Sequence, residues 1–122
     1  MAEPLFDVRL GERPYTASGA LSQGMLVVPH STADQVVAAP ATGPVSLLCL
    51  TNGTSGSRVD VMPIPRGAEI RVLAAGNITA GAEVEFGATT NIGKVVAFSS
   101  GTKVGRAQEA AAAGGLVKIV VY

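Results

Sequence analysis

The sequence is poor in the residue types that build aromatic cores and catalytic centres. Only five of its 122 residues are aromatic, none is tryptophan, and it has one cysteine and one histidine. Charged residues make up 15% of the chain, whereas an average soluble domain has roughly 25%. We therefore expect one domain with a core of valine, leucine, isoleucine and alanine, and few solvated helices.

Two kinds of partner are not expected. The nine basic residues stand singly along the chain, so no stripe of them could neutralise a run of phosphates, which argues against nucleic-acid binding. The longest apolar runs are far shorter than the roughly 18 residues that span a bilayer, which argues against a membrane. Residues 1–4 carry an acid and a proline where a secretory signal needs a basic start, which predicts synthesis in a cytoplasm.

Catalytic and metal-binding patterns are sparse. His30 has a serine and an aspartate nearby, but neighbours in one loop do not point at one another as a Ser-His-Asp triad requires. Glu83 and Glu85 could form an acid-base pair. Charge alternation on a solvated strand explains them better, because Glu69 and Arg71 hold the matching places upstream. Spaced cysteine, histidine or aspartate ligands are missing too. We predict no catalytic residue, no metal, no cofactor and no enzymatic activity.

Short β-favouring runs separated by turn residues cover most of the chain. Val59 and Val61 alternate with polar neighbours, the period of a strand with one wet face. Asn52-Gly53 is expected to form the tight turn of a hairpin. The predicted strands are 25–28, 35–39, 45–50, 58–62, 67–72, 81–86, 94–98, 104–109 and 116–121.

An internal repeat supports this interpretation. The sequence GAEIRV at 67–72 recurs as GAEVEF at 81–86, and each copy predicts a turn followed by a strand. Such short spacing is typical of a meander or small barrel. Ala107 to Ala113 has high helix propensity but spans two turns at most, so we expect a strand, an Ala-rich link and a closing strand. Cys49 lies in an apolar run and is expected to be buried.

The fold class that follows is all-β: a small β-barrel or β-sandwich with an N-terminal arm and at most one short helix. Residues 1–20 are predicted to be the arm, because they mix charges with Pro4 and Pro14 and end in the flexible Ser18-Gly19. Residues 21–122 are predicted to be the β domain. A first strand of the domain itself is the alternative for the arm.

The C-terminal half resembles the phage capsid cement (decoration) proteins of the DUF2190 type. The resemblance lies in Gly76 to Val84, Asn91 to Val96 and Val104 to Ile119, and Gly24 to Val28 is similar as well. Arg106 departs from the pattern, where an apolar residue is more usual. The resemblance implies a structural virion protein that binds the outside of the expanded capsid, with the major capsid protein as partner and a homotrimer as its assembly.

In that setting the arm is the expected anchor. Its alternating residues suit a β-strand added to a partner, and the predicted capsid-binding residues are Leu5, Phe6, Val8, Arg9 and Leu10. The other function considered is a non-catalytic β module that binds carbohydrate or peptide in a tail or cell-surface complex. Sugar sites usually stack rings on tryptophan or tyrosine, and here only Tyr15 and Tyr122 offer one.

Overall fold

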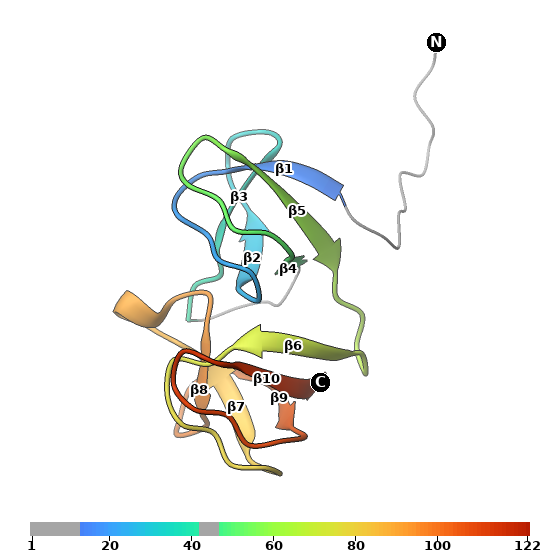
Figure 1. Cartoon of the computed structure of the whole chain (residues 1–122), viewed down its shortest axis with the longest axis vertical. Coiled ribbons are helices and arrows are strands. Elements are labelled where there is room, and N and C mark those ends of the chain that lie inside the picture. Colours follow the sequence, from blue (N-terminus) through green and yellow to red (C-terminus); the bar gives the residue numbers. More distant parts are fainter. Residues whose placement is uncertain (1–12, 42–46) are drawn as a thin grey trace.

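A computed structural model describes residues 13–41 and 47–122, and these form two stacked β units (Figure 1). The first, here called the N-unit, contains β1 to β5, and the second, the C-unit, contains β6 to β10. The strands are β1 Arg13–Ala17, β2 Leu26–Pro29, β3 Gln35–Ala38, β4 Leu47–Cys49, β5 Arg58–Pro63, β6 Glu69–Leu73, β7 Glu83–Phe86, β8 Val95–Ala97, β9 Lys103–Ala107 and β10 Leu116–Val121.

The all-β prediction is confirmed. Each predicted strand overlaps an observed one, and the only helical element of the described residues is the single 3-10 turn Thr89–Asn91. The Ala-rich link is not helical, because Ala111 exchanges two backbone hydrogen bonds with Ile78 in a distant loop, at 2.8 and 2.9 Å. Backbone groups bonded across loops in this way are not available to a helix.

The N-unit is a closed barrel with strand order β1-β3-β2-β4-β5. Its first strand, β1, runs antiparallel to β5 and parallel to β3. Part of the predicted arm, residues 13–17, is therefore a strand of the barrel, as in the alternative that the sequence left open. The remaining residues of the arm up to 12 lie outside the described residues.

The C-unit is a five-stranded sheet of order β6-β10-β9-β7-β8. The two copies of the sequence repeat lead into β6 and β7, and both begin at a glycine with positive φ, Gly67 at 80° and Gly81 at 84°. The apolar residues of both copies face one core. These core residues are Ile70, Val72, Val84 and Phe86.

The two units share one topology, so the chain is an internal duplication. In the N-unit, β1 pairs with β5, β5 with β4, β4 with β2, and β2 with β3, all antiparallel, and β3 returns parallel to β1. In the C-unit β6, β10, β9, β7 and β8 pair in the same sequence, and a parallel bridge from Ala74 to Val95 joins β6 to β8.

Details outside the strands repeat as well. The isolated bridge Leu21 to Gly53 in the N-unit has its counterpart in the bridge Ile78 to Ala111. Gly24 and Gly81, both with positive φ, precede the second strand of their units. A positive φ favours glycine because a side chain is strained there. The two units thus correspond in a turn glycine, Gly24 or Gly81, and in a buried apolar residue, Leu21 or Ile78.

The joint between the units lies between β6 and β8, the counterparts of the strands β1 and β3 that close the barrel of the N-unit. In the N-unit the backbone N–H of Thr16 donates to the carbonyl of Asp34 at 2.8 Å. The equivalent N–H, of Leu73, donates instead to the carbonyl of Gly24 at 2.8 Å, and the N–H of Leu26 donates to Gly93 at 2.7 Å. The start of β2 is therefore inserted between β6 and β8, and Leu26 belongs to the core of the C-unit.

One predicted turn is wrong in detail. Gly53 of the Asn52-Gly53 pair is held in the bridge to Leu21, and the positive φ of this loop falls on Gly56 at 87°. Gly53 is nevertheless constrained, since a Cβ there would come within 2.5 Å of a methyl group of Val59. Close approach of the backbone to the core explains this glycine, and the hairpin between β4 and β5 forms as predicted.

Cys49 is fully buried in the N-unit core, as predicted. Burial raises the pKa of its thiol above the ordinary 9.0, although a backbone hydrogen bond with Thr51 acts in the opposite direction. Thiolate is the reactive species. At pH 8 we expect native protein to react with a thiol reagent on the order of a hundredfold more slowly than protein in denaturant. Equal rates in a colorimetric thiol assay would contradict this burial.

Candidate functional site

The residues predicted to bind a capsid, Leu5, Phe6, Val8, Arg9 and Leu10, lie outside the described residues. In the part of the chain that is described, no three His, Cys, Asp or Glu side chains gather as they would around a metal ion. Nor does that part include a helix long and apolar enough to cross a membrane. The ring of His30 accepts a hydrogen bond from the N–H of Thr32 at 3.1 Å.

A row of side chains crosses the outer surface of the C-unit. Glu69 on β6 pairs with Val120 on β10, Val120 with Arg106 on β9, and Arg106 with Glu83 on β7. Because alternate residues of a strand point to opposite sides of the sheet, these four share the face opposite the core. Charged side chains from three strands are thereby brought together.

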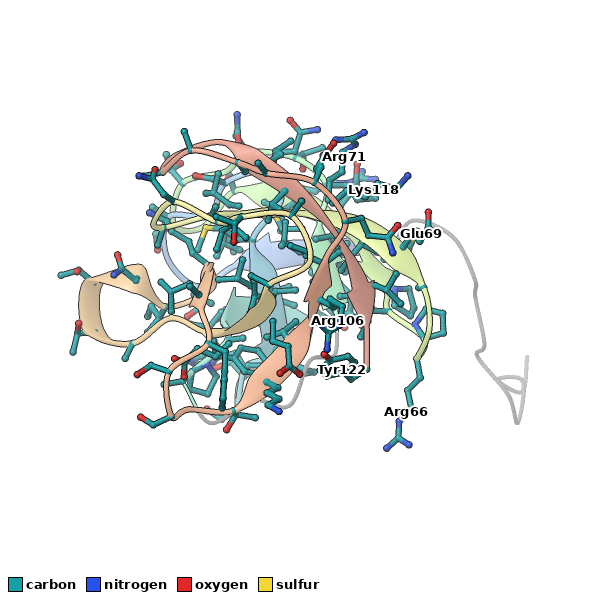
Figure 2. The ribbon with its side chains drawn as sticks, turned by 90° about the horizontal axis from the view of Figure 1, so that it is seen from below. Arg66, Glu69, Arg71, Arg106, Lys118 and Tyr122 are labelled. Atoms are coloured by element: carbon teal, nitrogen blue, oxygen red, sulfur yellow. The ribbon has the colours of Figure 1, made fainter. Side chains whose placement is uncertain are left out.

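Glu83, at the end of this row, is the centre of a cluster with Tyr122, Lys103 and Arg106. Its carboxylate oxygen Oε2 accepts a hydrogen bond from the hydroxyl of Tyr122 at 2.6 Å and lies 3.3 Å from Nζ of Lys103 and 3.9 Å from a guanidinium nitrogen of Arg106. The same guanidinium donates to the carbonyl of Gly81 at 2.8 Å. Figure 2 shows Arg106 beside Tyr122 on this surface. The cluster joins β7, β9 and the end of β10.

The hydrogen bond from Tyr122, followed by that from Lys103, lowers the pKa of Glu83 below its ordinary 4.5, and the bond to Glu83 raises the pKa of Tyr122. A carboxyl with a lowered pKa stabilises the fold above its ordinary value and loses that contribution as pH falls through the lowered value. Tyr122→Phe should therefore move the pKa of Glu83 toward 4.5 in a carboxyl NMR titration. Tyr15→Phe, on the other unit, should leave it unchanged.

Further ion pairs lie beside this cluster. Lys118 and Glu69 are 3.3 Å apart, and Arg71 and Glu109 are 2.7 Å apart. In Figure 2 the side chains of Arg71, Lys118 and Glu69 follow one another along the same border of the C-unit. Exposed pairs of this kind contribute about 0 to 1 kcal/mol each, so they shape the surface charge more than the stability.

A pocket of about 260 Å³ adjoins this cluster, because Lys103 and Tyr122 also line the pocket. Its apolar lining consists of Ile64, Phe86, Val104 and Val121, and its polar lining of Arg66, Thr102, Lys103 and Tyr122. Arg66 projects away from the body of the C-unit in Figure 2, without an ion pair to any described residue. The pocket therefore combines apolar and cationic lining residues.

The predicted solvated face of Glu83 and Glu85 is wrong for Glu85. That side chain is buried, with 8% of its surface exposed, and it accepts a hydrogen bond from the N–H of Ser99 at 2.7 Å. The pairing of β7 with β9 shifts register between Val84 and Glu85, and such a bulge re-aims a side chain. Only Glu83 stays on the outer face, so the two carboxyls do not share one environment.

Comparison with known proteins finds a likeness in structure. No family model and no curated protein matches the chain, so the resemblance to DUF2190-type cement proteins stays a prediction. A solved structure, the head fiber gp8.5 N base in bacteriophage phi29, matches with a TM-score of 0.75 at 23% sequence identity. The match covers 92% of this chain and 93% of that one. The chain therefore has the fold of that head-fiber base.

Proposed function

We propose that the chain is a structural virion protein that attaches to the outside of a phage head. The observation that carries this proposal is the fold, which matches a phage head-fiber base over nearly the whole of both chains. The sequence resemblance to capsid cement proteins supports the same class of function from an independent source.

In its finer form the proposal is a decoration protein that binds the expanded capsid and stabilises it. A ligand that binds one state of a shell and not the other stabilises that state by mass action. The described surface fits a role in contact rather than catalysis, since its charged side chains are bonded mainly to one another. The major capsid protein is the proposed partner.

A homotrimer would strengthen weak contacts. Once one subunit is bound, the second and third bind at a raised effective concentration, so that modest individual contacts suffice. Sedimentation equilibrium of the isolated protein should then give a mass three times the 12.3 kDa of the chain. A single-chain mass at micromolar concentration would contradict the trimer and leave attachment to the head untouched.

Co-sedimentation with capsids prepared without this protein tests the main proposal. We expect saturable binding to expanded capsids and at least about tenfold weaker binding to unexpanded ones, a difference of 1.4 kcal/mol. A chain that begins at Arg13 lacks the predicted anchor, Leu5, Phe6, Val8, Arg9 and Leu10, and should bind at least about tenfold more weakly than the full chain. Sedimentation of the full chain with neither capsid form would refute the proposal.

A fiber base is the second candidate function, favoured by the identity of the structural neighbour. In that case a further structure would extend outward from the chain on the virion. Electron microscopy of intact particles separates the two, because a decoration protein leaves a low knob and a base leaves a knob that carries a fiber.

A further inference from the structure

The duplication gives each position of the C-unit a counterpart in the N-unit. Leu26 of the N-unit pairs with Leu48, and at the same places of the C-unit Glu83 pairs with Arg106. The N–H of Ala39 donates to Leu26, and that of Phe98 donates to Glu83 in the same way, both at 2.9 Å. Leu26, Ala39 and Leu48 thus form one surface of the N-unit. The equivalent surface of the C-unit is formed by Glu83, Phe98 and Arg106.

On the N-unit this surface is already an interface. Leu26, Ala39 and Leu48 are buried in the core that also contains the strands of the C-unit. On the C-unit the equivalent surface is formed by Glu83, Phe98 and Arg106, and among the described residues no second unit is stacked on it. The equivalent surfaces thus differ in their surroundings: that of the N-unit packs against the C-unit, and that of the C-unit is exposed.

The open surface retains apolar area. Four large hydrophobic side chains of the described residues are exposed by more than a third, and two of them, Phe98 at 38% and Tyr122 at 48%, lie here. Nζ of Lys103 is 4.7 Å from the centre of the Phe98 ring and bridges it to Glu83. The pocket that Lys103 and Tyr122 line continues the surface toward Arg66. The two rings and the pocket together offer a partner apolar area to cover.

Its charge indicates the chemistry of the partner. From residue 64 to 122 the chain carries six cations and four carboxylates, a net charge of +2, whereas from 13 to 63 two of each balance. At the open surface Arg66, Lys103 and Arg106 outnumber Glu83. A complementary partner is acidic and offers a large apolar side chain for the pocket.

We propose that this surface, formed by Arg66, Glu83, Phe98, Lys103, Arg106 and Tyr122, is where the C-unit docks on an acidic, apolar patch of the capsid subunit. The inference rests on the proposed function and gives it a second contact besides the predicted anchor. The pocket receives an apolar side chain of the capsid subunit, and Arg66 and Lys103 meet carboxylates around it.

Two substitutions at exposed positions test it by co-sedimentation of the full chain with expanded capsids. Arg66→Glu reverses the charge of a residue that lines the pocket, and Thr102→Trp fills the pocket. Each should weaken binding at least about tenfold. Matched controls on the N-unit, Arg58→Glu and Thr54→Trp, should change it less than about twofold. Circular dichroism and the thermal midpoint establish that all four variants are folded.

The outcomes separate the two proposals. If the natural chain binds expanded capsids and both test variants bind equally well, the surface is not the interface, and attachment to the head stands. If the natural chain does not bind, the proposed function fails first. If Arg66→Glu or Thr102→Trp lowers the mass in sedimentation equilibrium, the surface joins copies of this chain to one another, which also overturns the capsid contact.

Discussion

Leu26→Glu is expected to lower the free energy of unfolding by more than about 4 kcal/mol, a large part of the roughly 5 to 15 kcal/mol that an ordinary domain has. Leu26 is fully buried in the core shared by the two units, and its own N–H bonds to Gly93 across the joint. A carboxylate there would lose its hydration without gaining a partner, which is among the costliest changes a core can undergo. Urea denaturation followed by circular dichroism measures the loss.

The duplication supplies a matched control. Glu83 stands at the equivalent place of the C-unit, on the outer surface, so Glu83→Leu should change the stability far less than Leu26→Glu does at neutral pH. The same pair of residues is exchanged in both variants, and only the surroundings differ. Comparable losses in the two variants would mean that the joint between the units is not where the structure has it.

A chain that begins at Leu21 is expected to lose the folded N-unit. It lacks β1, and with it the side chains of Tyr15 and Ala17 and the hydrogen bonds that close the barrel, such as that from Ala17 to Ser57 at 2.8 Å. Strands β3 and β5 would each be left with an open edge, which favours aggregation. Size-exclusion chromatography and the dispersion of amide NMR signals measure the outcome.

A chain that begins at Arg13 is the control for this truncation, because it keeps all of β1 and its pairing with β3 and β5. It should elute as a folded species with dispersed signals. If the chain from Leu21 were equally well folded, β1 would be dispensable, and the whole of residues 1–20 would behave as the arm first predicted from the sequence.

Local patterns were enough to predict nine of the ten described strands. Alternation such as that of Val59 and Val61, and turn glycines such as Gly67 and Gly81, act over a few residues and are visible in a single chain. The 14-residue repeat was detected for the same reason. β1 was harder to predict, because Arg13 and Pro14 are not typical of a strand. Its stability comes from pairing with residues some twenty and forty-five positions away.

The duplication and the candidate site depend on long-range register. Leu26 and Glu83 are equivalent in the fold but share no chemistry, because one is buried at the joint and the other faces outward. Glu83 and Tyr122 are 39 residues apart and meet only when β7, β9 and β10 are aligned. The displacement of Glu85 arises from a bulge, which no local pattern announces. The contact of Glu83 with Tyr122 and the burial of Glu85 therefore become visible only when the strands are paired in the sheet.

The insertion of Gly24 to Leu26 between β6 and β8 makes the second half of the chain depend on the first. A fragment that begins at Ile64 would carry every strand of the C-unit, yet the N–H of Leu73 and the carbonyl of Gly93 would lose their partners. Two strand edges facing an apolar opening are a template for pairing with other chains. During synthesis the N-unit emerges first and is ready to fill that opening as β6 and β8 form, so the order of the halves along the chain itself protects against misassembly.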